Sequence, residues 1–118
     1  MKIKGIVKKS LGRGKKLGFP TANIEVSGKF PEEGIHIGTV GPMELPALIF
    51  VGAAKTFDET EKKIEIYILD FDGDIYGEEI EVDLVKKLRD NMKFASTEEL
   101  VAQMKEDERS AQEFFADM

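Results

Sequence analysis

The residues with the clearest chemical potential form a glycine-rich stretch near the start of the chain, residues 10–23. Gly12, Gly14 and Gly18 fall within seven residues, so the backbone there can curl with positive φ angles. Such a curl can direct successive N–H groups at an anion. Cationic side chains between the glycines add further donors: Arg13, Lys15 and Lys16. The pattern indicates either a cradle for phosphate or an ordinary surface loop, and glycine spacing by itself does not separate the two.

Two neutral oxygen donors follow the glycines. Thr21 and Asn23 are two residues apart, a spacing that on a strand places both side chains on one face. Magnesium accepts oxygen ligands of this kind, and Pro20 fixes the approach of the backbone by locking φ. The stretch is not a P-loop, because the G-x-x-x-x-G-K-[ST] order is missing. It is not a dinucleotide-binding fingerprint either, because no βαβ unit surrounds it.

Glu65 and His36 are further candidates for chemistry. Residues 64–69 alternate so that three isoleucines share one face, while Glu65 lies on the other face with Tyr67 and Leu69. A carboxylate on a rigid strand can act as a general base, and the alternative is a solvent-facing strand glutamate. His36 is the only histidine, so Ser-His-Asp chemistry would require it as the base. A structural role and a place in a ligand pocket are both open for His36.

Six short strands are expected to position these residues. Glycines and prolines divide the first half of the chain into short pieces, which favours strands over helices. The expected strands are 3–7, 22–26, 34–40, 47–52, 64–71 and 79–85. Six strands followed by one helix predict an all-β or mainly β fold, a small closed barrel with the helix packed on it, because closure removes exposed sheet edges.

The helix is expected to begin at a capping box. The Ser96 hydroxyl can accept a hydrogen bond from the backbone N–H of Glu99, whose side chain can reach back to the start of the helix. Apolar residues then recur at helical spacing: Leu100, Val101, Met104, Ala111 and Phe115. This stripe predicts packing against the barrel rather than a surface for a partner.

Length and charge restrict the class of protein. The chain has 118 residues, which is enough for one domain over residues 1–118 and too few for two cores. Its formal net charge of -6 argues against general nucleic-acid binding. Residues 1–19 nevertheless hold seven Lys or Arg and no acid. This cationic segment indicates either a small anionic ligand such as a phosphate or a solvated pair of strands.

The chain contains no cysteine, so disulfides, thiolate metal sites and cysteine nucleophiles are excluded. It has no apolar run long enough to cross a membrane and no signal-peptide core at its start. We therefore expect a cytoplasmic protein with no membrane partner.

A longer motif carries a family resemblance. Gly12-Arg13, followed by Leu-Gly-Phe-Pro-Thr-Ala-Asn-Ile at residues 17–24, resembles the nucleotide-binding signature of riboflavin kinases. Residues 64–71 are similar to the strand that carries the catalytic glutamate of this family. Asp74-Ile75-Tyr76-Gly77, and Leu88-Arg89 with Phe94, also match in order. The resemblance extends over nearly the whole chain.

The resemblance implies a fold and an activity. The fold would be a six-stranded antiparallel Greek-key barrel with a C-terminal α-helix. The activity would be transfer of the γ-phosphoryl group of ATP to the ribityl 5'-hydroxyl of riboflavin, giving FMN. Magnesium or another divalent metal would be the cofactor, with ATP as co-substrate and riboflavin and FMN as substrate and product. The expected partners are these small molecules, with no nucleic acid, and the expected state is a monomer.

The resemblance also implies roles for individual residues. Glu65 would be the catalytic base, Thr21 and Asn23 would bind the metal, and Arg89 and Phe94 would lie on the flavin side. The implied nucleotide-binding residues are Gly12, Arg13, Gly14, Lys15, Leu17, Gly18, Pro20, Thr21, Asn23 and Tyr76.

The chain departs from the family pattern in places. His36 stands where an aromatic residue commonly follows the Gly34-Ile35 pair, and Ala54-Lys55 replaces the Arg-Pro that precedes Thr-Phe in bacterial members. Bacterial relatives usually carry an adenylyltransferase domain before the kinase, and its absence here predicts no FAD synthesis. Three alternatives stay open: a kinase with another nucleotide donor, a flavin- or nucleotide-binding barrel without catalysis, and a barrel that binds single-stranded nucleic acid.

Overall fold

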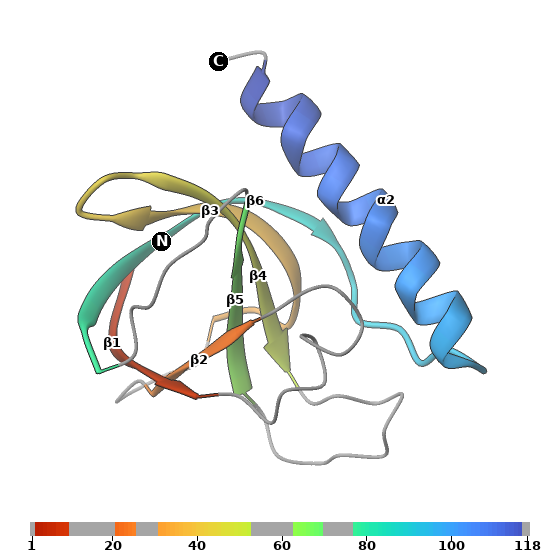
Figure 1. The fold of residues 1–118 in the computed structure, drawn as a ribbon, viewed down its shortest axis with the longest axis horizontal. Coiled ribbons are helices and arrows are strands. Elements are labelled where there is room, and N and C mark those ends of the chain that lie inside the picture. Colours follow the sequence, from red (N-terminus) through yellow and green to blue (C-terminus); the bar gives the residue numbers. More distant parts are fainter. Residues whose placement is uncertain (1, 10–20, 26–30, 53–62, 70–76, 117–118) are drawn as a thin grey trace.

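The computed structural model describes residues 2–9, 21–25, 31–52, 63–69 and 77–116. In that part of the chain it contains six strands followed by one helix (Figure 1). The elements are β1 (Lys2–Lys9), β2 (Ala22–Glu25), β3 (Gly34–Gly41), β4 (Leu45–Gly52), β5 (Lys63–Ile68), β6 (Glu79–Arg89) and α2 (Thr97–Ala116).

The six strands close into an antiparallel barrel in the order β1-β2-β5-β4-β3-β6. Strands β3, β4 and β5 follow one another as neighbours, and β2 lies beside β5 rather than beside β3. This is the arrangement of a Greek key. The expectation of a six-stranded Greek-key barrel is therefore confirmed. Closure leaves no unpaired edge strand in the described sheet.

The barrel interior is filled by alternate residues of every strand, as the two-residue period of a strand requires. Its largest fully buried members are the β-branched side chains of valine and isoleucine, which pack well on a pleated surface. The buried interior cluster comprises Ile3, Val7, Ile24, Val40, Ala47, Ile49, Val51, Ile64, Ile66, Ile68, Ile80 and Val82. The three isoleucines of β5 lie in this cluster, as their alternation predicts.

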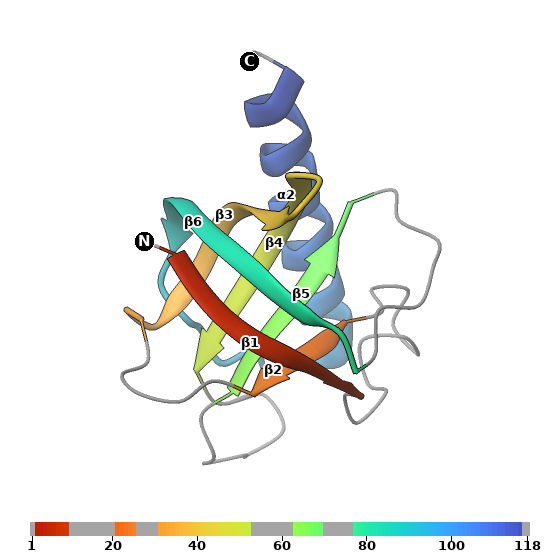
Figure 2. The ribbon, with the colours of Figure 1, turned by 90° about the vertical axis from the view of Figure 1, so that its left-hand side faces the viewer.

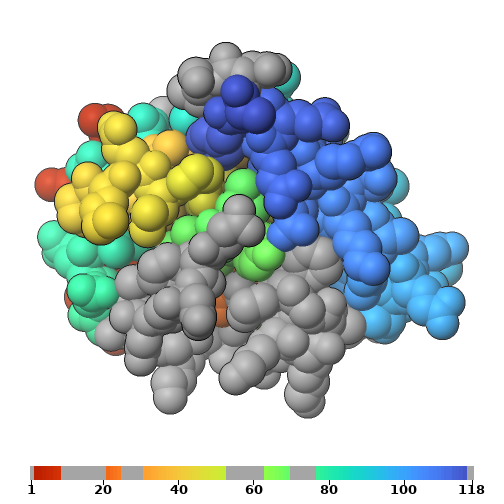
Figure 3. Space-filling view, turned by 45° about the horizontal axis from the view of Figure 1, so that its top comes forward, coloured from red at the N-terminus to blue at the C-terminus, as the bar shows by residue number. Residues whose placement is uncertain are grey.

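A second apolar cluster lies outside the barrel, beneath α2. Figure 3 shows the helix packed against the surface of β4 and β5, coloured yellow to green. Tyr67 and Leu69 belong to this cluster, so the two faces of β5 were predicted correctly. Its other members are Ile35, Ile37, Leu48, Phe50, Leu88, Ala111, Phe114 and Phe115. The apolar stripe of the helix therefore packs on the barrel.

Within the described residues, no helix is long and apolar enough to span a bilayer.

The start of α2 is capped as expected, with one difference. The backbone N–H of Glu99 donates to Ser96 Oγ at 3.2 Å. The Glu99 carboxylate accepts from the backbone N–H of Ala95 at 3.1 Å, one residue before the expected position. Both bonds satisfy amides that the first helical turn leaves without intrahelical partners.

Strand β6 is longer than predicted, because it continues beyond residue 85 to Arg89. Its pairing with β3 contains register shifts between Ile35 and His36 and between Ile37 and Gly38. Bulges of this kind bend a strand and turn its side chains. The end of β6 lies beside α2 in Figure 1, and Leu88 joins the cluster under the helix. Figure 2 shows the rest of β6 crossing the barrel next to β1. The predicted ends of β2 and β5, at residues 26 and 70–71, lie outside the described residues.

Candidate active site

Glu65 and Asn23 lie directly opposite each other on neighbouring strands. Asn23 of β2 is the register partner of Glu65 of β5. Cα atoms of such antiparallel pairs lie about 4.5–5.5 Å apart, and paired side chains share a face. Ile24 and Ile64, the next pair, point into the barrel, so Asn23 and Glu65 lie on the outer face. The carboxylate and the amide suggested by the sequence are therefore within reach of one ligand.

Asn23 has the property expected of a ligand-binding residue. In the described part of the chain, its Oδ1 atom is buried and accepts no hydrogen bond. A buried acceptor without a partner costs free energy, so such an atom calls for an explanation. Thr21 immediately precedes β2 and is half-buried. These two neutral oxygens suit magnesium, whose remaining ligands would be phosphate oxygens and water.

Among the described residues, no three His, Cys, Asp or Glu side chains form a group that could hold a metal ion.

The other neighbour of Glu65 is aromatic. Phe50 of β4 is its register partner on the side away from Asn23. Phe50 is half-buried and packs on the cluster beneath α2. Glu65 thus separates a polar side, formed by β2, from an apolar side, formed by β4 and the helix. That arrangement suits a carboxylate that must contact an alcohol at the junction of a charged group and a planar apolar one.

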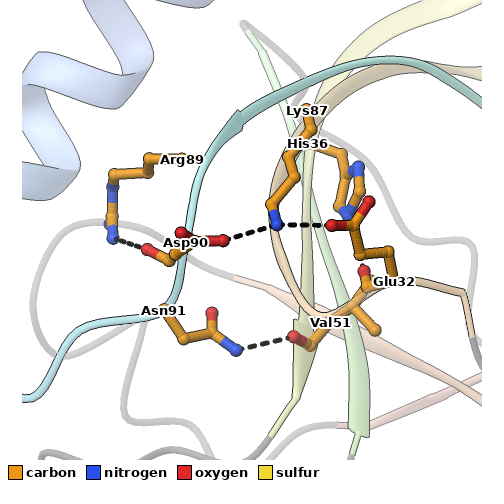
Figure 4. A network of polar contacts seen from close by, with 7 residues as sticks. All are labelled: Glu32, His36, Val51, Lys87, Arg89, Asp90 and Asn91. Atoms are coloured by element: carbon orange, nitrogen blue, oxygen red, sulfur yellow. Dashed lines mark hydrogen bonds and ion pairs between the residues drawn. The ribbon is translucent and has the colours of Figure 1, made fainter.

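The apolar side continues into the segment between β6 and α2, residues 90–96. Asn91 Nδ2 donates to the carbonyl oxygen of Val51 at 2.9 Å, which attaches this segment to the end of β4 (Figure 4). The approach is close: a Cβ on Gly52 would lie 2.4 Å from Asn91 Nδ2. Gly52 also has φ of +136°, a conformation that other residues rarely adopt.

Arg89 and Phe94, expected on the flavin side, lie next to each other. The guanidinium carbon of Arg89 is 5.9 Å from the centre of the Phe94 ring, within the range of a cation–π contact. Arg89 also forms two hydrogen bonds to the carboxylate of Asp107 on α2. Neither Asp107 nor Phe50 was among the site residues expected from the sequence. An aspartate at a stripe position, between Met104 and Ala111, was the available signal for the first.

A network of ion pairs joins the end of β6 to the start of β3 (Figure 4). Lys87 Nζ lies 2.5 Å from Asp90 Oδ1 and 2.8 Å from Glu32 Oε1. The pKa of Asp90 is lowered from 3.8, because Lys87 donates a hydrogen bond to it and adds a positive charge. The pKa of Lys87 is raised from 10.5 by its hydrogen bonds to Asp90 and Glu32.

His36 is buried, and its Nε2 donates to the carbonyl oxygen of Glu32 at 2.8 Å. Its ring satisfies a main-chain acceptor beside the Lys87 network, which supports a structural role for it.

The remaining predicted nucleotide-binding residues lie outside the described residues. They are Gly12, Arg13, Gly14, Lys15, Leu17, Gly18, Pro20 and Tyr76, and the departure at Ala54-Lys55 lies outside as well.

Fold and site together define a class of protein, a closed Greek-key barrel with a polar and aromatic site beside its C-terminal helix. Residues 1–115 match the family model Flavokinase, described as riboflavin kinase. The chain therefore belongs to the riboflavin kinase family, and the resemblance seen in the sequence is confirmed.

Two relatives illustrate the similarity. The chain is 39% identical to the bifunctional riboflavin kinase/FMN adenylyltransferase of Listeria monocytogenes, over 96% of this chain and 38% of that protein. It is 37% identical to the RNA-binding riboflavin kinase RibR of Bacillus subtilis, over 89% of this chain and 47% of that protein. The chain thus spans less than half the length of either relative.

Two solved structures share the fold. One is described as a macrolide-efflux protein from Streptococcus pneumoniae, with a TM-score of 0.81 and 35% identity over 94% of this chain and 38% of that chain. The other is riboflavin kinase from Trypanosoma brucei, with a TM-score of 0.65 and 22% identity over 98% of this chain and 79% of that chain.

Proposed function

We propose that this chain is an ATP:riboflavin 5'-phosphotransferase that produces FMN and ADP. The observation that supports it most strongly is the pairing of Glu65 with Asn23, whose buried Oδ1 has no hydrogen-bond partner in the described part of the chain. Membership of the riboflavin kinase family supplies the substrates. Residues 1–118 would act as one domain and as a monomer in the cytoplasm, where ATP is available.

In this reaction Glu65 accepts the proton of the ribityl 5'-hydroxyl. The hydroxyl oxygen forms a bond to the γ-phosphorus as the bond from that phosphorus to the bridging oxygen breaks, and ADP leaves. Thr21 and Asn23 would hold magnesium, which when bound offsets the charge on the phosphate oxygens. Positioning and charge stabilisation carry most of the catalysis in phosphoryl transfer.

The flavin ring system would lie on the other side of Glu65, against Phe50 and Phe94. A planar, apolar ring suits this side, because it can stack on the aromatic rings of Phe50 and Phe94. The polar ribityl chain would then lead to Glu65, where the aromatic side meets the polar one.

The test is to incubate the purified protein with riboflavin, magnesium and each of the four common nucleoside triphosphates, and to look for FMN by chromatography. FMN formation with ATP is the expected result. Absence of FMN with every donor, together with quenching of riboflavin fluorescence, would favour the non-catalytic binding barrel. If neither FMN nor quenching is seen, flavins are not the substrates.

The name of the Bacillus subtilis relative reports RNA binding for that protein. We propose that this chain has no nucleic-acid partner. Its net charge is -6, and the β1 lysines Lys2 and Lys4 lie within 3.8 and 3.9 Å of Glu81. A gel-shift assay with labelled RNA at low and high salt tests this, because binding through phosphates weakens steeply with salt.

A further inference from the structure

Asp107 is an ionisable residue buried on the face of α2 that packs against the barrel. Only 1% of its surface is exposed. Its carboxylate accepts from Arg89 Nε at 2.9 Å and from Arg89 Nη2 at 2.7 Å, a two-pronged contact. Gln103 Nε2 donates to the same carboxylate at 3.1 Å. The guanidinium plane is therefore held from the helix side in one orientation.

The desolvation cost of this buried ion pair indicates that it contributes something other than stability. Removing two charges from water is unfavourable, and apolar side chains of similar volume often stabilise a core as well as a buried ion pair does. The surrounding cluster is apolar, with Leu88 and Ala111 among its members. An aliphatic residue at position 107 would extend the apolar stripe of α2, so the aspartate is best explained by what it orients.

Arg89 transmits this orientation to the segment 90–96. Its Nη1 donates to the carbonyl oxygen of Asp90 at 3.1 Å, and its guanidinium lies over the Phe94 ring. Asn91 attaches the same segment to the end of β4 through Val51. Val51 adjoins Phe50, the register partner of Glu65. A continuous set of contacts thus leads from Asp107 to the aromatic side of the site.

We propose that Asp107 is a positioning residue for riboflavin: through Arg89 it holds Phe94 and the segment 90–96 as the wall against which the flavin ring binds. This inference rests on the proposed kinase function. Asp107 does not touch the substrate in this account, and Arg89 acts through the segment rather than on the reacting atoms. The nucleotide, on the β2 side of Glu65, lies away from these contacts.

The test compares Asp107→Asn with wild type. The amide of asparagine presents N–H groups to the guanidinium, so one of the two prongs is lost. We expect KM for riboflavin to rise about ten-fold or more, because the wall against which the ring binds is no longer held in place. In enzymes a misplacement of about 1 Å can lower the rate about 100-fold. KM for MgATP should change by less than about two-fold, because its site lies on the far side of Glu65. Hydrogen exchange in residues 90–96 should increase without any substrate present.

Two further variants sharpen the test. Arg89→Lys keeps the positive charge but loses the fork of donors, so it should reproduce the split between the two KM values even if Asp107→Asn folds poorly. Glu106→Gln is the matched control. It lies one residue before Asp107 on α2, is exposed, and within the described part of the chain forms an ion pair with Arg109 of the same helix. It should behave as wild type.

The outcomes are distinguishable. FMN formation by wild type, with an unchanged riboflavin KM in both Asp107→Asn and Arg89→Lys, would overturn the positioning role and leave the kinase function intact. An equal rise in both KM values would also overturn it, because it would indicate a general structural defect. No FMN from wild type under any condition would overturn the proposed function, and the positioning role with it.

Discussion

Glu65 lies between two unlike neighbours, Asn23 on β2 and Phe50 on β4. A carboxylate at such a boundary can contact a substrate hydroxyl that lies between a charged phosphate on one side and a planar apolar ring on the other. The geometry explains why an ordinary strand position, rather than a loop, carries the proposed base: both neighbours are fixed by main-chain pairing, which limits their movement.

Glu65→Gln removes the proton acceptor while keeping the size and shape of the side chain. We expect turnover to fall at least about ten-fold, because general-base assistance contributes about 100- to 10,000-fold in enzymes. Nucleotide binding should survive. Steady-state kinetics and a nucleotide titration measure the two effects. Glu81→Gln, at a half-buried strand glutamate paired with Lys2 and Lys4, is the control. Wild-type turnover in Glu65→Gln would remove Glu65 from the mechanism.

Asn23→Ala tests whether the buried oxygen serves a ligand or the fold. Because Oδ1 accepts no hydrogen bond in the described part of the chain, its loss breaks no contact there. The free energy of unfolding should therefore fall by less than about 1 kcal/mol. The magnesium and ATP concentrations needed for half-maximal rate should both rise. A large loss of stability with unchanged magnesium dependence would assign Asn23 a structural role instead. Urea denaturation and kinetic titrations give the two numbers.

At the scale of elements, the end of β6 and the start of α2 form the part of the fold on which the proposed flavin side depends. The bulges in the β3–β6 pairing bring Leu88 to the helix. The ion pairs of Lys87 join this end of β6 to Glu32, just before β3. A helix anchored at its first turn and at Asp107 then covers the outer cluster.

Ser96→Ala removes the hydroxyl that accepts from the N–H of Glu99. We expect a loss of about 1 kcal/mol in the free energy of unfolding, which is typical of an N-cap replaced by alanine. Ser110→Ala, in the middle of the same helix, should cause no comparable loss, because alanine favours a helix interior. Thermal and urea denaturation would measure both. Equal effects of the two substitutions would contradict the role of the cap.

Asp90→Asn tests the Lys87 network through its pH dependence. The pKa of Asp90 is lower in the folded chain than its ordinary value of 3.8, so the folded state binds fewer protons there. Its contribution to stability is present above that ordinary value and is lost as the pH falls through the lowered pKa. Wild type should therefore be more stable than Asp90→Asn near neutral pH and converge with it in acid.

The difference between these two proteins should also shrink at high salt, because the side chain of Asp90 is 86% exposed and its charge is screened. The pKa of Lys87 is raised above its ordinary value of 10.5. The contribution of Lys87 to stability is therefore fully present below 10.5 and is lost as the pH rises through the raised pKa. If the difference in stability between wild type and Asp90→Asn does not change between about pH 3 and 7, the lowered pKa of Asp90 is contradicted. Urea denaturation across this range provides the measurement.

At the scale of the whole molecule, the barrel serves as a rigid frame and the site lies on its outer surface beside the helix. Both substrates would bind the folded state alone, so they should stabilise it. At a free concentration of 100 times Kd, a ligand contributes about 2.7 kcal/mol. Riboflavin and MgATP should each raise the midpoint of thermal unfolding, and a chelator should cancel the effect of MgATP while leaving that of riboflavin. No shift with riboflavin would argue against a flavin site.

The faces of the strands and the start of the helix follow from short stretches of sequence. Alternation in residues 64–69 assigns three isoleucines to the barrel interior and Glu65 and Tyr67 to the outside, because the side-chain period of a strand is local. The capping box at Ser96 and the apolar stripe that follows likewise depend on residues within a few turns. The Pro-Thr-Ala-Asn motif at residues 20–23 carries the resemblance to the riboflavin kinase family.

Which of these residues meet depends on the fold of the whole chain. Asn23 and Glu65 are far apart in the chain, and their pairing follows from the closure of the barrel, which places β2 beside β5. The register of such a pair depends on the packing of all six strands and cannot be inferred from the periodicity of either one. The same holds for Asp107: an aspartate in an apolar stripe acquires its proposed role because the pairing of β6 with β3 brings Arg89 to it.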